Sequence, residues 1–73
     1  MTKYRVIAAV GSYPYNSVEI ERLDFYQNDE NSAKAIGLAI ATFYNGPNAY
    51  VKLYKITKKK NDKFARRSIV AYY

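Results

Sequence analysis

The fold is decided by residues 29–44, which read DENSAKAIGLAIATFY. Apolar side chains in this stretch recur at the three-and-four spacing that places them on one face of a helix. They are Ala33, Ile36, Ala39, Ile40 and Phe43. Asn28 or Asn31 can cap the start of the helix, and the Asn-Gly-Pro sequence at residues 45–47 can end it. The pattern predicts a helix that buries its largest apolar side chains, Ile36, Ile40 and Phe43, against a sheet.

Segments on both sides of this helix have the composition of strands. Residues 3–10 alternate between two faces, and residues 49–57 and 64–73 are rich in β-branched and aromatic side chains. Residues 58–63, with Asn61 and Asp62, have turn composition and separate the last two segments. We therefore expect one strand at the start of the chain and a hairpin at its end.

Residues 18–26 predict a further strand whose register changes midway. Its apolar residues are Val18, Ile20, Leu23 and Phe25, and the first two have the opposite parity from the last two. A β-bulge near Glu21 and Arg22 would let all four face the core. The alternative is a short helix capped by Asn16, with Glu19 at its third position.

The predicted order is ββαββ, a small α+β domain in which one helix packs on one face of an antiparallel-rich sheet. Seventy-three residues suffice for one hydrophobic core only, so residues 1–73 are expected to form a single domain. The chain has no cysteine, which fits a reducing, cytoplasmic setting. Its apolar runs are far shorter than the roughly 20 residues that cross a membrane, so no membrane partner is expected.

The composition argues against an enzyme. Histidine and cysteine are absent, and the three glycines are isolated, so neither a catalytic triad nor a phosphate-binding loop is expected. Glu19 and Glu21 would share a strand face and, with Asp24, could hold a magnesium ion. An acidic cluster beside Arg22 is more typical of a solvated surface. We therefore predict no catalytic residue, no metal ligand and no cofactor.

The positive charge is concentrated at the end of the chain. The net charge is +6, but residues 52–73 carry eight basic side chains against Asp62 alone. Such an excess favours an anionic partner, either nucleic acid or an acidic protein surface, over simple protection of an edge strand. The residues expected to bind it are Lys52, Tyr54, Lys58, Lys59, Lys60, Lys63, Arg66 and Tyr72.

Parity distinguishes the two arginines of the last strand. Arg67 shares its parity with Ala65, Ile69 and Ala71, which form the more apolar set. This pattern predicts that Arg67 faces the core and that Arg66 lies on the helix-free face, available for contact.

Tyrosines alternate with these basic residues. Tyr50, Tyr54, Tyr72 and Tyr73 suit base stacking, although cross-strand aromatic pairs that only stabilise a sheet are equally consistent with them. Residues 49–53, AYVKL, resemble part of the aromatic RNA-recognition strand of RRM domains. The basic-Gly-aromatic sequence that precedes it in that family is missing here, and so is a second helix. The resemblance implies stacking of RNA bases on this strand.

We therefore predict a non-enzymatic binding protein that engages an anionic macromolecule through a basic, tyrosine-rich hairpin. As a compact chain without an active site, it is similar to the small accessory proteins that phages use as inhibitors of host machinery. One alternative is a homo-oligomer, such as a homodimer, paired through residues 64–73. Another is a histidine-free ribonuclease. Tyr13 and Tyr15 could instead form the binding loop, or their rings could cover the core.

Overall fold

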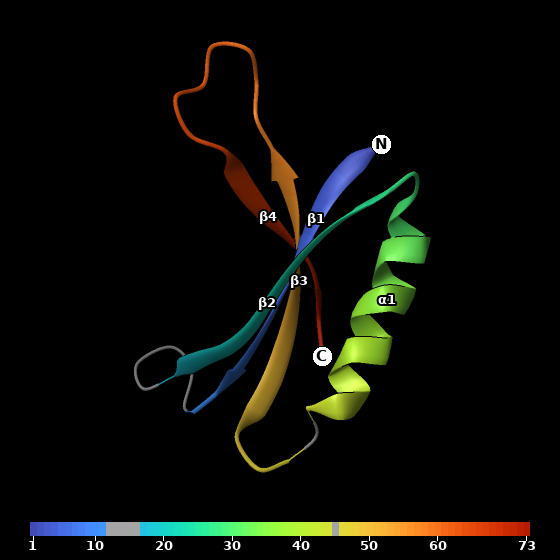
Figure 1. Cartoon of the computed structure of the whole chain (residues 1–73), viewed down its shortest axis with the longest axis vertical. Helices are drawn as coiled ribbons and strands as arrows, with labels where there is room; N and C mark the ends of the chain where they lie inside the picture. The colour runs from blue at the N-terminus through green and yellow to red at the C-terminus, as the bar shows by residue number, and fades with distance from the viewer. Residues whose placement is uncertain (12–16, 45) are drawn as a thin grey trace.

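A computed structural model of the chain describes residues 1–11, 17–44 and 46–73. It confirms the ββαββ order, with four strands and one helix in the described residues (Figure 1). The elements are β1 (Thr2–Val10), β2 (Val18–Gln27), α1 (Glu30–Phe43), β3 (Ala49–Thr57) and β4 (Arg66–Tyr72). The strands form one antiparallel sheet in the order β2-β1-β3-β4. No helix of the described residues is long and apolar enough to cross a membrane.

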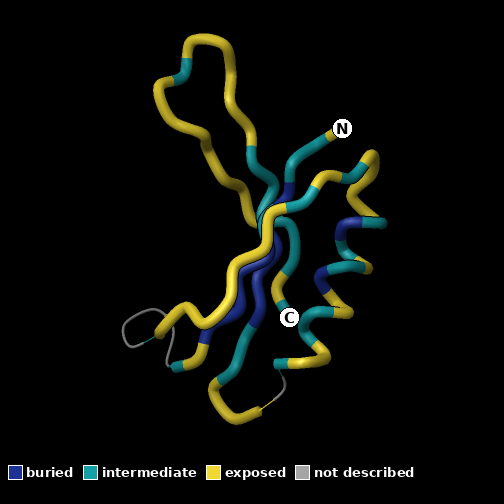
Figure 2. Tube along the Cα trace, viewed as in Figure 1, coloured by how far each residue is buried: buried dark blue, intermediate teal, exposed yellow. Residues whose placement is uncertain are grey.

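The core lies between α1 and the two central strands, where the tube in Figure 2 is darkest. Alternate residues of β1 and β3 point toward the helix because side chains along a strand alternate between the two faces. Val6 of β1 pairs directly with Leu53 of β3, and both are buried. The other members of this buried cluster are Tyr4, Ala8, Ala33 and Val51.

The helix lies within the predicted stretch, but its N-cap and the face that it presents to the sheet differ from the prediction. Asp29 is its N-cap, in place of the predicted Asn28 or Asn31, and its Oδ1 accepts a hydrogen bond of 2.6 Å from the Ser32 amide. Two predictions about burial were wrong or overstated. Phe43 is 86% exposed, and Ile36 is only half-buried. The side chains and glycine that face the core are Ala33, Gly37, Ile40, Ala41 and Tyr44.

Two small residues explain why α1 presents this face to the sheet. Ala33 and Gly37 are the buried residues of α1, and they allow the C-terminal Tyr73 to lie directly against the helix backbone. The Tyr73 hydroxyl donates a hydrogen bond of 2.7 Å to the carbonyl oxygen of Lys34. Tyr73 also exchanges two backbone hydrogen bonds with Val51, so the ring is held from both ends. Burial raises the pKa of its phenol, which favours the protonated, donating form.

Because of this contact, the effect of a Gly37 substitution on stability should depend on Tyr73. A Cβ at Gly37 would lie 2.8 Å from the Tyr73 hydroxyl, so Gly37→Ala should displace the ring and lower stability. In a Tyr73→Ala background the same change should raise the free energy of unfolding by about 1 kcal/mol, because alanine is the better helix former. Denaturant unfolding of the four proteins measures both effects. Stabilisation by Gly37→Ala in both backgrounds would contradict the close contact.

The β-bulge expected in β2 exists, one residue before its predicted position. β1 pairs regularly through Ala8 with Glu21, and then Ala9 pairs with Glu19, so Ile20 is the extra residue. The pairing places Val18, Leu23 and Phe25 on the helix side of the sheet. The expectation that all four apolar residues face the core was wrong, because Ile20 is the bulged residue and Val18, Ile20 and Leu23 are all exposed. Of these, Phe25 packs against the core cluster and stacks on Tyr4 at 5.8 Å between ring centroids. The strand assignment is therefore correct, and the alternative of a short helix is not.

A second bulge in β4 was not predicted. Leu53 pairs with Ala71 and Tyr54 pairs with Ile69, which leaves Val70 as the extra residue. Val70 and Ala71 consequently both pack against the core cluster. The bulge also reverses the face of every residue before it in β4, which decides where the arginines of this strand lie.

Candidate nucleic-acid interface

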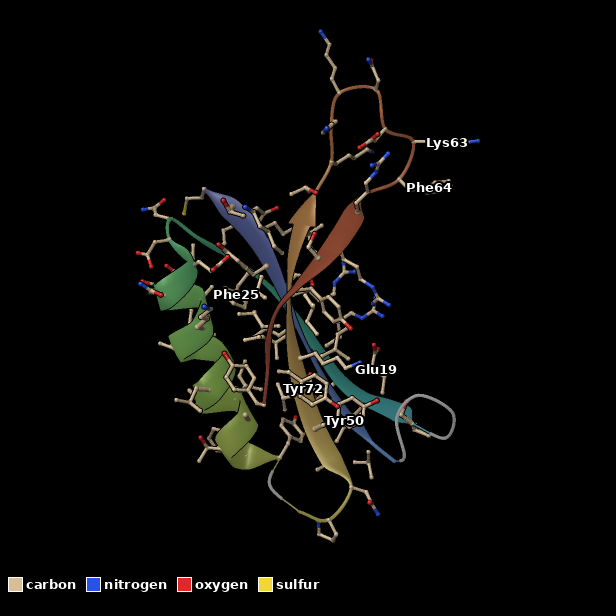
Figure 3. All side chains as sticks on the ribbon, turned by 180° about the vertical axis from the view of Figure 1, so that it is seen from behind. Glu19, Phe25, Tyr50, Lys63, Phe64 and Tyr72 are labelled. Carbon is tan, nitrogen blue, oxygen red and sulfur yellow. The ribbon has the colours of Figure 1, made fainter. Side chains whose placement is uncertain are left out.

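The face of the sheet that α1 leaves uncovered carries aromatic and basic side chains from both C-terminal strands. We call it the helix-free face, and Figure 3 shows the molecule from behind with Tyr50 and Tyr72 labelled. Strand pairing places on it, from β3 and β4, Tyr50, Lys52, Tyr54, Ile56, Arg67, Ile69 and Tyr72. Of the predicted binding residues, Lys52, Tyr54 and Tyr72 are therefore brought together here.

Tyr50 and Tyr72 form the centre of this surface. Their rings are stacked, with centroids 6.0 Å apart and planes inclined by 6° (Figure 3). Lys52 lies between the same strands, and its Nζ is 5.3 Å from the Tyr50 centroid and 5.5 Å from the Tyr72 centroid. Only 7% of Lys52 is exposed, whereas 56% of Tyr72 is. Tyr72 thus offers an open aromatic ring beside a positive charge held by cation–π contacts.

The predicted faces of the two arginines were wrong. Because of the bulge at Val70, Arg67 pairs with Ile56 on the helix-free face, and its guanidinium lies 4.7 Å from the Tyr54 centroid. Arg66 pairs with Thr57 on the other face, and its Nη2 lies 3.5 Å from an oxygen of Asp62. Tyr73, one of the tyrosines expected to stack on bases, is directed to the helix instead.

A depression lies beside these side chains on the helix-free face. Its volume is about 230 Å³, and its floor includes the apolar Ile7 and Ala9 of β1. Its sides are formed by Ser17, Glu19, Tyr50, Lys52, Tyr54 and Arg67. A surface that combines flat rings, cationic groups and a shallow apolar floor has the features that bind unpaired nucleobases and their phosphates.

Ion pairs join the charged side chains of β1 and β2 on the same face. Asp24 accepts two hydrogen bonds from Arg5, of 2.7 and 3.0 Å, and Glu19 accepts two from Arg22, of 2.9 and 3.3 Å. The Arg5 guanidinium holds the pKa of the Asp24 carboxyl below its ordinary value. The charged side chains on this side of the face are therefore engaged with one another.

The magnesium site suggested by Glu19, Glu21 and Asp24 is not formed. The bulge at Ile20 places Glu19 and Glu21 on opposite faces of β2, so the expected shared face was wrong. Glu21 instead approaches the Tyr44 hydroxyl at 3.5 Å on the helix side. Within residues 1–11, 17–44 and 46–73, no three acidic side chains form a group that could hold a metal ion.

The remaining predicted residues lie in the loop between β3 and β4. Lys58, Lys59, Lys60 and Lys63 are exposed there, and this part of the chain projects beyond the sheet (Figures 1 and 2). Asp62 organises the loop, because its Oδ2 accepts a hydrogen bond of 3.2 Å from the Lys59 amide and its own amide donates to the Lys59 carbonyl. We call residues 58–65 the basic loop.

Sequence reasoning missed Arg67, although its charge was evident, because its face depends on a bulge that no composition signal marks. The predicted Tyr13 and Tyr15 loop lies outside the described residues. No protein-family model, curated protein or solved structure matches this chain. The candidate interface is therefore interpreted from its own chemistry.

Proposed function

We propose that this domain binds single-stranded nucleic acid on its helix-free face. The observation that carries the proposal is the stacked pair Tyr50 and Tyr72 beside Lys52, on a sheet face that no helix of the described residues covers. Aromatic rings stack on every type of base, so such a surface is tolerant of sequence. Paired bases in a duplex cannot reach these rings, which favours a single strand over a duplex.

Arg67 and the basic loop supply the phosphate contacts of this proposal. Arg67 is held over Tyr54, so its guanidinium is oriented before any ligand arrives. The basic loop continues from the same two strands and carries four lysines against Asp62. A single strand of several nucleotides that stacks on Tyr72 and follows β4 toward its first residue would bring successive phosphates to Arg67 and then to the basic loop. Binding without a catalytic step agrees with the absence of histidine and cysteine.

The experiment that tests this proposal is a salt series with a fluorescent single-stranded oligonucleotide, followed by anisotropy. Binding should weaken linearly in logarithmic plots of affinity against salt, because phosphate contacts release counterions. Replacing Lys58, Lys59 and Lys60 with serine should reduce the slope by about 2, since each phosphate contact contributes about 0.7 for a single strand. The association rate should fall as well.

Controls distinguish binding of nucleic acid from nonspecific attraction to any negatively charged polymer. Lys34→Ser removes a lysine from the helix and should leave the slope unchanged. Polyglutamate carries charges without bases, so it should compete weakly, and a duplex of equal length should bind less tightly than the single strand. Equal competition by polyglutamate would instead indicate an acidic protein partner. The absence of salt-dependent binding to any of these ligands would refute the proposal.

A further inference from the structure

A second surface of the molecule lies at the opposite edge of the sheet. β2 is an edge strand, and no strand of the described residues pairs with its outer side. Its ten residues contain neither proline nor lysine, two of the residues that natural edge strands use to prevent pairing. Only the bulge at Ile20 interrupts it, which leaves residues 21–27 as a regular edge.

Apolar surface adjoins this edge on the helix side. α1 packs mainly against β3, so an open groove of about 290 Å³ remains between the helix and β2. The groove is lined by Val6, Ala8, Leu23, Ile40, Phe43 and Tyr44, together with the charged Glu21. Leu23 is 45% exposed and Phe43 is 86% exposed. A domain this small gains stability when such surface is removed from water.

The charges along β2 are self-complementary in one antiparallel register. When Leu23 is opposite Leu23 of another copy, Arg22 of each copy is opposite Asp24 of the other. Arg22 and Asp24 both lie on the helix-free face, as directly opposed residues must. Arg22 already bonds Glu19, and Asp24 bonds Arg5, so the new pairs would join two existing ion pairs into one network.

The other edge of the sheet does not have this property. β4 contains Arg66 and Arg67 and no acidic residue, so two β4 strands side by side would bring like charges together. The sequence-based expectation of a homo-oligomer paired through residues 64–73 is therefore less favourable electrostatically than pairing through β2.

We infer that the β2 edge is a self-association surface, through which two copies of this chain form a symmetric dimer centred on Leu23. The two sheets join into one, with both helices on the same side. The two Leu23 side chains then contact each other, and this contact lies beside the groove of each copy. Both helix-free faces remain open and lie on the same side of the joined sheet. This inference is independent of the nucleic-acid proposal.

Sedimentation of the protein alone, without nucleic acid, tests the inference. The wild type should sediment at twice its monomer mass of 8.4 kDa. Leu23→Lys should be monomeric because it places two positive charges opposite each other, and Leu23→Glu should be monomeric for the corresponding reason. An equimolar mixture of the two variants should form a dimer again, since lysine then opposes glutamate. Leu38→Lys, at an exposed leucine on the outside of α1, is the matched control and should remain dimeric.

Arg22→Asp provides a second disruptive variant that alters only an exposed side chain. It places aspartate opposite Asp24 and should also yield a monomer. Circular dichroism should show native folding for all these proteins. A wild type that stays monomeric at high concentration overturns the inference. So does a dimer that survives Leu23→Lys, or a mixture of the Lys and Glu variants that remains monomeric.

Discussion

Leu53→Ala should lower the free energy of unfolding by about 2–5 kcal/mol, the range found when a buried leucine is truncated. Leu53 is completely buried at the centre of β3, where it pairs with Val6 on one side and Ala71 on the other. The lost methyl groups leave a cavity that the two flanking strands cannot close without breaking their pairing. For a domain of this size, the loss is a large part of a total stability of about 5–15 kcal/mol.

Leu38→Ala is the matched control for this prediction. It removes the same atoms from an exposed position on α1, and alanine and leucine are both good helix formers. Its effect should stay within about 0.5 kcal/mol, as for other surface changes. Chemical denaturation followed by circular dichroism measures both variants. Equal losses for Leu53→Ala and Leu38→Ala would show that the core is not centred on β3.

Tyr72→Ala should weaken binding of a single-stranded oligonucleotide by about 10- to 100-fold, because stacking of one base on an aromatic ring contributes about 1–3 kcal/mol. Tyr72 is more exposed than buried, so the variant should remain folded. Tyr72→Phe retains the ring and should keep most of the affinity. Phe43→Ala removes an exposed aromatic ring from the helix and should change nothing. Anisotropy titrations at one fixed salt concentration compare the four proteins.

A loss of affinity for Tyr72→Ala that Phe43→Ala matches would indicate general damage rather than stacking. Full affinity of the Tyr72→Ala variant would show that the Tyr72 ring does not contact the nucleic acid. In that case the lysines of the basic loop alone would account for attraction to the nucleic acid, without any contact to bases.

The regular elements of this fold could be predicted because their signals are local. A three-and-four repeat identifies α1, and turn residues between two β-rich segments identify the β3–β4 hairpin. Both signals depend on a few neighbouring residues, so the bulges in other parts of the chain do not affect them. The change of parity between Ile20 and Leu23 even predicted a bulge in β2, within one residue of its observed position.

The orientation of these elements could not be predicted, because it depends on contacts between distant residues. A hydrophobic pattern favours Phe43 as a core residue, whereas Gly37 has no side chain to contribute to such a pattern. Yet Gly37 permits the close approach of the Tyr73 ring to the backbone of α1. The bulge at Val70 likewise has no compositional signal, and it moves Arg67 to the helix-free face.

The same limits apply to the candidate interface. Its residue types could be identified from the basic and aromatic excess after residue 51, and Lys52, Tyr54 and Tyr72 share one face as a strand period requires. The sequence alone could not identify which of the two arginines joins them. A single inserted residue in β4 reverses the faces of Arg66 and Arg67 without altering the composition of the strand.

The central claim is that nucleic acid contacts the helix-free face, and amide chemical-shift mapping tests it most directly. ¹⁵N-labelled protein is titrated with a short oligothymidylate. We expect the largest shifts in β3, β4 and the basic loop, with Tyr54, Arg67 and Tyr72 among them. Amides of α1 should move little. Shifts confined to α1 and the groove beside β2, or no shifts at a saturating concentration, would contradict the claim.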